Sequence, residues 1–323
     1  MIVVAGLGMS GSYLLKRLDD EGFEVRGFDP KTQDFYVPCG YATNIRKLRD
    51  ILRSVNLNAD DYIEREGKDV TISGPDLPEL TFSSAGICTI DKNRLENDLI
   101  SGHKHERARA KYESGDTVID ATGVSRYYLG QAENDFLMYT KEYLTDEADH
   151  ADFHFRYFSR GTGYYWEFPL KNGFHVGAGA DSVEAINQSL AGVVYKKVLS
   201  RKIRLKPLFD QMFNQNIIGT GESIGTVSPI TGEGIIPSLT SAEILVQCLK
   251  EAVDTEELKL LYRERIRDRF AAYQGLFDLL VSSRNGKMFT LRNIKNAKFA
   301  KADFEGFGID IKIWEIMRHL IPI

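Results

Sequence analysis

The chain is poor in the features that mark disulfide-rich, membrane-spanning and nucleic-acid-binding proteins. Its three cysteines, Cys39, Cys88 and Cys248, are widely spaced and form no Cys-x-x-Cys pair, so the sequence predicts neither a disulfide framework nor a zinc site. No uninterrupted apolar run approaches the roughly 18 residues that a membrane span needs. The net charge of −5 at pH 7 argues against nucleic acid as the main partner, because phosphate binding requires a basic field.

These absences predict a soluble, cytoplasmic protein that contacts, at most, the surface of a membrane. Three free cysteines suit a reducing compartment, and the first expected strand begins at residue 2, which leaves no room for a signal peptide ahead of it. One basic run, residues 196–206, could attract a phosphate or an anionic membrane surface. The more usual interpretation of such a run is the solvated face of a helix.

The chain does contain a dinucleotide-binding fingerprint in its first 29 residues. A short buried strand to Ala5 is followed by the turn Gly6-Leu7-Gly8-Met9-Ser10-Gly11, a helix over residues 12–21, and a second strand over residues 25–28 that ends at Asp29. The glycines permit the turn, a close approach to a pyrophosphate, and tight packing of helix on strand, while the acid accepts hydrogen bonds from ribose hydroxyls. At this point the ligand can be either NAD or FAD.

Beyond the fingerprint, the 323 residues are 43% hydrophobic and 27% charged, a globular composition with a length typical of about two domains. Helices are predicted over residues 40–57, 89–100, 185–199, 235–250 and 256–281, and a buried strand over residues 116–123. Residues 62–82 read as a small antiparallel excursion. In residues 126–180 aromatic and polar residues alternate, which predicts an antiparallel sheet whose buried face forms either a plain core or the wall of an apolar pocket.

The predicted fold is therefore α/β, or α+β overall. A Rossmann-like dinucleotide-binding domain comprises residues 1–60, 85–125 and 216–250. An antiparallel-sheet substrate domain comprises residues 61–84 and 126–215, and a C-terminal helical region comprises residues 251–323.

Glycine-rich turns at residues 6–11, 120–123 and 221–234 all follow expected parallel strands, so they should meet at one edge of the sheet, where ligands bind. In the last turn Gly232 and Gly234 permit close backbone approach, and Pro237 suits the first turn of the next helix. A ring laid against that helix start would feel a positive dipole, which favours an anionic reduced flavin. The alternative is a strand-to-helix turn with glycines for geometry only.

Four segments resemble the geranylgeranyl reductase family of flavoproteins, a branch of the p-hydroxybenzoate hydroxylase-like group. They are the fingerprint with Asp29, Pro38-Cys39-Gly40, the aromatic motif at 164–169 with Val176-Gly-Ala-Gly179 after it, and Gly221-Glu222 with residues 229–235. The chain departs from the family at Glu222, where Asp is usual, and at Gly161, where Pro is expected. It is also shorter between residues 99 and 115 and in its C-terminal region.

The resemblance implies FAD as the cofactor and assigns it a set of binding residues: Gly6, Gly8, Ser10, Gly11, Asp29, Cys39, Gly40, Lys92, Arg94, Thr122, Gly123, Glu222, Gly232, Glu233, Gly234 and Ile235. For Lys92 and Arg94 a solvated helix charge is an equal alternative. A second set would contact the substrate: Tyr164, Trp166, Phe168, Pro169 and Gly177.

The activity implied by the resemblance is reduction of isolated C=C bonds in geranylgeranyl chains of lipids or their precursors. Cys39 would act as a catalytic residue that relays a proton or shapes the approach of the substrate, or else be a small buried apolar side chain. No second fingerprint is present, so electrons would come from a transient donor, NAD(P)H or a ferredoxin-like protein. The alternatives are a flavin monooxygenase of the same group and a non-catalytic protein that binds FAD or prenyl lipid.

No metal site is predicted. His150 and His154 have helical spacing and lie near Asp149 and Asp152, but the alternating pattern around them favours a strand.

Overall fold

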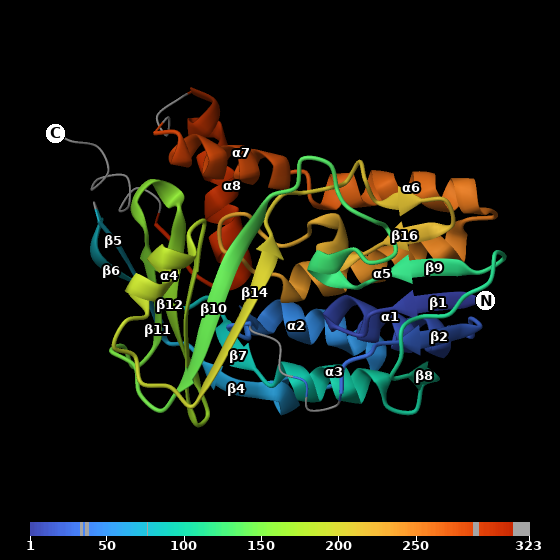
Figure 1. Ribbon diagram of the computed structural model, residues 1–323, viewed down its shortest axis with the longest axis horizontal. Helices are drawn as coiled ribbons and strands as arrows, with labels where there is room; N and C mark the ends of the chain where they lie inside the picture. The colour runs from blue at the N-terminus through green and yellow to red at the C-terminus, as the bar shows by residue number, and fades with distance from the viewer. Residues whose placement is uncertain (33–34, 36–38, 76, 287–290, 313–323) are drawn as a thin grey trace.

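The structure is a computed structural model that describes residues 1–32, 35, 39–75, 77–286 and 291–312. Pro38 and residues 313–323 of the predicted C-terminal region lie outside the described residues. Figure 1 shows an antiparallel sheet standing beside a largely parallel one, with helices packed against the parallel sheet and between the two. None of the helices in the described part of the chain has the length and apolar character that crossing a bilayer demands.

The parallel sheet holds the fingerprint. Its central strand, β1, pairs in parallel with β2 and β9, and β9 pairs in parallel with β16. Val3, Val4, Val118 and Ile119 are fully buried, as expected for strands covered on both faces. In order across the sheet the strands are β15 (Phe213–Asn214), β16 (Ile217–Gly219), β9 (Thr117–Asp120), β1 (Ile2–Ala5), β2 (Val25–Phe28) and β8 (His105–Glu106).

The helices beside this sheet confirm most of the predicted pattern. Helix α1 packs on α3 and α5, and α5 packs on α6, so the fingerprint helix lies in the middle of the helical layer. Asn44 caps α2 by accepting hydrogen bonds from the N–H groups of Arg46 and Lys47. The bounds are α1 (Met9–Asp20), α2 (Ile45–Leu52), α3 (Lys92–Ile100), α5 (Ile235–Glu251) and α6 (Thr255–Arg269).

The aromatic segment forms the predicted antiparallel sheet. Alternate residues Phe153, Phe155, Trp166 and Phe168 are buried on one face, because successive side chains of a strand point to opposite sides. In order across the sheet the strands are β14 (Lys197–Arg204), β10 (Leu137–Thr145), β13 (Gly173–Ala180), β12 (Gly163–Leu170), β11 (Phe153–Tyr157), β5 (Asp69–Gly74) and β6 (Leu77–Ser83). Strand β5 pairs in parallel with β11, and the other neighbours in this sheet are antiparallel.

A smaller sheet connects the two large ones, and the segment 62–82 is divided between sheets rather than forming one excursion. Its first strand, β4, joins the small sheet, whereas β5 and β6 extend the aromatic sheet. The small sheet consists of β3 (Ala42–Asn44), β7 (Ile87–Ile90) and β4 (Ile63–Glu66).

The aromatic core is closed by the end of the described chain. Phe304, Phe307, Ile309 and Ile311 are buried against the aromatic sheet. The Gly308 carbonyl accepts hydrogen bonds from the N–H groups of Ala85 and Ile87. The remaining helices are α4 (Val183–Ser189), α7 (Tyr273–Arg284) and α8 (Leu291–Phe307).

Two of the predicted helices differ from the structure in further ways. The single helix expected over residues 256–281 is divided into α6 and α7, with residues 270–272 between them. The helix expected over residues 185–199 ends at Ser189, and the basic run that follows it forms strand β14, paired with β10. Gly192, with a φ of 82°, adopts a left-handed conformation between the two elements. The residues of β14 alternate in exposure, which is the period of a strand, and pairing with β10 decides the outcome.

Gly11→Ala is expected to lower the free energy of unfolding by about 1–3 kcal/mol, the usual cost of an extra methyl group in a packed contact. A Cβ at Gly11 would lie 1.8 Å from the carbonyl oxygen of Gly6. Urea denaturation followed by circular dichroism measures the change. Gly115→Ala is the control, because a Cβ there meets nothing within 4 Å. Equal stability of the two variants would contradict the prediction.

Candidate functional site

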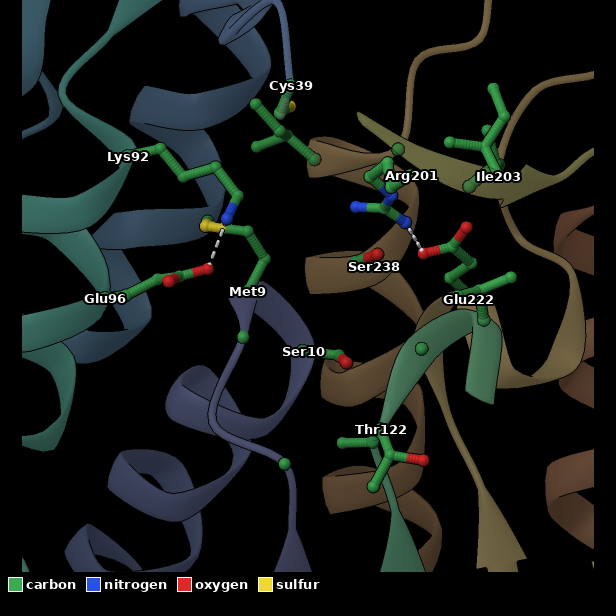
Figure 2. A pocket seen from close by; sticks show the side chains of 18 of the residues that line it. Met9, Ser10, Cys39, Lys92, Glu96, Thr122, Arg201, Ile203, Glu222 and Ser238 are labelled. Atoms are coloured by element: carbon green, nitrogen blue, oxygen red, sulfur yellow. Dashed lines mark hydrogen bonds and ion pairs between the residues drawn. The ribbon is translucent and has the colours of Figure 1, made fainter. Parts of the chain in front are cut away.

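A cavity of about 890 Å³ lies between the carboxyl ends of the parallel strands and the inner face of the aromatic sheet. Its volume is within the roughly 300–1,000 Å³ of ligand sites, and the ends of parallel strands are where doubly wound sheets bind ligands. The three glycine turns meet here, as the sequence predicted: Gly6 and residues 8–10, 121–123 and 232–234 line it. Figure 2 shows the polar side chains that face one another across the cavity.

The first turn is shaped for close backbone contact. Gly6 has a φ of 89°, and a Cβ there would lie 2.6 Å from the carbonyl oxygen of Ala121. Asp29 accepts a hydrogen bond from the Leu7 N–H at 2.6 Å and another from the Lys31 N–H at 2.9 Å. A carboxylate has about four acceptor positions, so Asp29 can hold the turn and still accept from a ligand hydroxyl.

Two lysines and a buried glutamate form the wall beside this turn. Glu96 is 2.6 Å from the Lys92 ammonium and 2.8 Å from that of Lys31. Burial by itself would raise the pKa of Glu96, but the two lysines outweigh it and hold that pKa below its usual value. The wall therefore carries one net positive charge. Lys31 and Glu96 were not predicted as site residues, although the i, i+4 spacing of Lys92 and Glu96 is a signal that both face the same side of α3.

The opposite wall carries a second ion pair. Arg201, from β14, binds the carboxylate of Glu222, which also accepts a hydrogen bond from the Arg204 N–H at 3.0 Å. Figure 2 places this pair across the cavity from Lys92 and Glu96. Glu222 was predicted as a site residue. Arg201 was missed because its segment was expected to be a solvated helix.

A buried arginine fastens this wall to its surroundings. The Arg204 guanidinium, in a residue 2% exposed, binds Asp135 at 2.9 Å. It also donates to the carbonyl of Glu222 at 2.9 Å and to that of Val124 at 2.8 Å. The loops after β9 and β16 are thereby tied to the edge strand of the aromatic sheet.

The turn at residues 228–234 is held from two sides. The Tyr164 hydroxyl donates to the Thr231 carbonyl at 2.8 Å, and Gly232 has a φ of 71°. Buried Glu233 accepts from the Thr43 hydroxyl and from the Ile236 N–H, both at 3.0 Å, at the start of α5. From α8, Asp303 accepts a hydrogen bond from the Ser228 hydroxyl. Burial raises the pKa of Glu233 to about 7 and that of Asp303 to about 6.

The apolar wall consists of the predicted aromatic residues. Tyr164, Trp166 and Phe168 line the cavity together with Cys39 and Gly40, and a Cβ at Gly40 would lie 2.5 Å from the Phe168 ring. Burial raises the pKa of the Cys39 thiol, which is therefore protonated at neutral pH.

Four predicted site residues lie outside the cavity lining. Gly11 packs behind the turn, against Gly6. Arg94 points away from the cavity, because it lies on the other face of α3 from Lys92, and its guanidinium donates to the Asp61 carbonyl at 2.9 Å. Pro169 accepts a hydrogen bond from the Thr89 hydroxyl, at 2.6 Å. Gly177 lies under Trp166, where a Cβ would be 2.2 Å from the ring.

Among the described residues, one group has the side chains of a metal site: Glu79, His150 and His154. The two imidazole rings stack with their centroids 3.7 Å apart and their planes 20° from parallel. A nitrogen lone pair lies in the plane of its ring, so stacked rings do not direct two lone pairs at one ion. The His150 Nδ1 is instead 2.8 Å from the Glu167 carboxylate.

The sequence profile of the tryptophan halogenase family matches residues 91–292, more than half of the chain. The chain belongs to the tryptophan halogenase family. A curated relative of this chain is an uncharacterised protein of Methanocaldococcus jannaschii. The two sequences are 24% identical over 331 residues, which span 84% of this chain and 88% of the relative.

Solved structures with this fold belong to several flavin enzymes. A geranylgeranyl bacteriochlorophyll reductase-like protein from Thermoplasma acidophilum has a TM-score of 0.74 at 17% identity, over 99% of this chain and 95% of that one. PqsL, a probable FAD-dependent monooxygenase from Pseudomonas aeruginosa, has a TM-score of 0.66 at 15% identity, over 92% and 99%. The flavin-dependent brominase Bmp2 has a TM-score of 0.69 at 12% identity, over 95% and 92%. These likenesses, all at less than 25% identity, confirm the predicted α/β fold.

The contribution of Glu233 to the free energy of unfolding of this tryptophan halogenase family member is expected to fall as the pH rises from about 4.5 to 7. Glu233 has a folded-state pKa of about 7 against an ordinary 4.5, so in this window the folded state binds more protons than the unfolded state and loses stability with rising pH. The contribution is on the order of 2–3 kcal/mol.

Glu233→Gln keeps the acceptor oxygen and is expected to flatten this slope, as measured by urea unfolding of the ligand-free protein at half-unit steps of pH. The exposed Glu147→Gln serves as the control and should keep the wild-type slope. A Glu233→Gln slope equal to that of the control would show that folding does not raise the pKa of Glu233.

Proposed function

We propose that the protein binds FAD in this cavity and reduces isolated C=C bonds of prenyl chains. The residues present fit the cofactor. The backbone at Gly6 and Gly8 is bare, the N-terminus of α1 opens onto the cavity, and the Lys31, Glu96 and Lys92 wall beside it carries net positive charge. Bare N–H groups and positive charge are what a pyrophosphate requires.

In this proposal different predicted residues bind different parts of the cofactor. Gly8, Ser10 and Lys92 hold the pyrophosphate, and Asp29 accepts from the adenosine ribose. Thr122, Gly123 and Glu222 would contact the ribityl chain. The turn from Gly232 to Ile235 offers its backbone N–H groups and the dipole of α5 to the flavin ring, which stabilises an anionic reduced state.

The chemistry follows from what an isolated alkene lacks. It has no carbonyl group to stabilise developing charge, so hydride and proton must be delivered in a fixed geometry and away from water. When bound, reduced FAD supplies the hydride from its N5 atom. Tyr164, Trp166 and Phe168 supply a wall that excludes water and accepts a prenyl chain. Cys39, at the same cavity, either relays a proton or shapes the approach of the chain.

The observation that carries this proposal is the position of the aromatic motif, which lines the same cavity as the glycine turns. The structural likeness to the geranylgeranyl bacteriochlorophyll reductase-like protein, over nearly the full length of both chains, supports it. The substrate would be a prenyl lipid or its precursor, met at most at a membrane surface, and the reductant a transient donor, NAD(P)H or a ferredoxin-like protein.

A second candidate is an oxygen-dependent flavin reaction, monooxygenation or halogenation. The match to the tryptophan halogenase profile and the likeness to PqsL favour it. It requires oxygen, whereas alkene reduction proceeds without it. A third candidate, a relative that binds FAD or prenyl lipid without turnover, predicts cofactor binding and no product under either condition.

Lys92→Met is expected to weaken FAD binding by about tenfold or more, because it removes the positive charge of the turn wall and leaves Glu96 with one partner. Arg94→Met is the matched control on the same helix and should bind FAD like the wild type, since Arg94 points elsewhere. Titration of flavin fluorescence at two salt concentrations gives both affinities. Equal losses in the two variants would remove Lys92 from the proposed site.

Anaerobic incubation of dithionite-reduced, FAD-loaded protein with geranylgeranyl lipids is expected to give products heavier by two hydrogens for each double bond, read by mass spectrometry. A parallel incubation with oxygen, NADH, a free flavin reductase and halide tests the second candidate with an indole substrate. Products in the aerobic arm alone would replace alkene reduction by oxygen-dependent chemistry. A colourless preparation that FAD cannot reconstitute would refute both.

A further inference from the structure

Glu142 is a buried acid in the cavity for which the sequence and the family resemblance give no role. It lies in the middle of β10, opposite Gly177 of β13 and Leu199 of β14, and is 1% exposed. Its side chain lines the cavity from the same strand face as Met138 and Thr140. Trp166 and Cys39 line the cavity with it.

The surroundings of Glu142 leave one carboxyl oxygen unbound. Its Oε1 accepts the Cys39 backbone N–H at 3.3 Å and lies 3.8 Å from the His175 Nδ1. Its Oε2 has no partner of hydrogen-bond geometry within the described ranges of the chain, and the Trp166 indole N–H beside it offsets only part of the effect of burial on the carboxyl. A buried ionised carboxylate with an open oxygen carries a large desolvation cost, which a protonated acid avoids.

The charged groups near Glu142 do not ionise it. Burial lowers the pKa of His175 to about 4, so this imidazole is neutral at pH 7. The Arg201 guanidinium is bound to Glu222 and only partly offsets the burial of Glu142. The Cys39 thiol is itself neutral. The net effect of burial is to raise the pKa of Glu142 to about 8.

We propose that Glu142 is the proton donor of the alkene reduction, an inference that rests on the proposed function. The π bond of the substrate breaks as one carbon gains hydride from the reduced cofactor and the other gains the proton on Oε2. Two C–H bonds form, the cofactor is oxidised, and water from the open side of the cavity reprotonates the carboxylate. The Cys39 N–H on Oε1 fixes the orientation of the acid.

Glu142 suits this task better than Cys39. General acids work best when their pKa is near the working pH, and Glu142 is close to that condition. Burial moves the thiol of Cys39 further from it. Cys39 would then position the acid and the chain rather than give the proton.

The test compares wild type, Glu142→Gln, Glu142→Asp, Cys39→Ala and the exposed control Glu147→Gln. Single-turnover oxidation of the dithionite-reduced holoenzyme by a geranylgeranyl lipid is followed anaerobically from pH 6 to 9.5. The wild-type and control rates should be level at low pH and fall above about pH 8, as the acid loses its proton. Glu142→Gln should slow the step by about 10²–10⁴-fold and lose the break in the pH profile. Cys39→Ala should keep the break.

A second readout does not depend on turnover. Infrared spectra of the FAD-loaded protein at pH 7 should contain a protonated-carboxyl C=O band that Glu142→Gln lacks and that disappears in the wild type above about pH 8. Glu142→Asp, which keeps an acid, should retain such a band and part of the rate.

The outcomes separate this inference from the proposed function. The role of Glu142 is overturned if the wild type reduces alkenes and Glu142→Gln has the same rate and pH profile. It is also overturned if the spectrum of Glu142→Gln keeps the protonated-carboxyl band. In both cases the proposed function still stands. If Glu142→Gln fails to fold, a Glu142→Asp rate without any shift in its pH break has the same meaning. A wild type that binds FAD but reduces no alkene overturns the proposed function and this inference together.

Discussion

The buried Arg204 guanidinium is the interaction on which the two-sheet arrangement depends. It contacts the loop after β9, the turn after β16, and Asp135 ahead of β10, so three segments that shape the cavity share one cation. Removing one partner of a buried ion pair typically costs about 3–5 kcal/mol, because the remaining charge is left without compensation. The relative position of the parallel-sheet edge and the aromatic sheet is thus set by hydrogen bonds to Arg204 as well as by apolar packing. Arg201, three positions earlier on the same strand, lines the cavity and binds Glu222.

The cavity combines two kinds of electrostatic environment. Near the fingerprint turn, Glu96 compensates one of the two lysine charges. The remaining positive charge is available to an anion. Near the aromatic wall, Glu142, Glu233 and Asp303 are buried with few cations, and each holds a proton more tightly than an exposed acid does. A protein gains no stability from such acids above their pKa values. Acids with raised pKa values are typical of functional sites, where they hold protons at neutral pH.

The sequence predicted the parts of this site that are local. The fingerprint, the buried strand before Thr122 and the aromatic alternation are short-range patterns, and the structure places them where the sheet rules require. The pairings across the cavity were not predictable in the same way. Arg201 meets Glu222, and Lys31 meets Glu96, only after the chain has folded. The helix expected over residues 185–199 had acceptable local signals, but pairing of residues 197–204 with β10 decided their conformation. Glu142 was not predicted as a site residue, because a single acid in an aromatic strand forms no recognisable motif with its neighbours in the sequence.

The closure of the aromatic core by residues 304–311 has a consequence for how the protein is made. Strands β5 to β13 emerge from the ribosome long before Phe304 and Phe307, yet these late residues pack on Phe155 and its neighbours. The Gly308 carbonyl also completes the hydrogen bonding of the segment between β6 and β7. Until that stretch is synthesised, the nascent sheet exposes an aromatic face that invites association with other chains. During synthesis the aromatic face is therefore covered later than the parallel strands of the fingerprint.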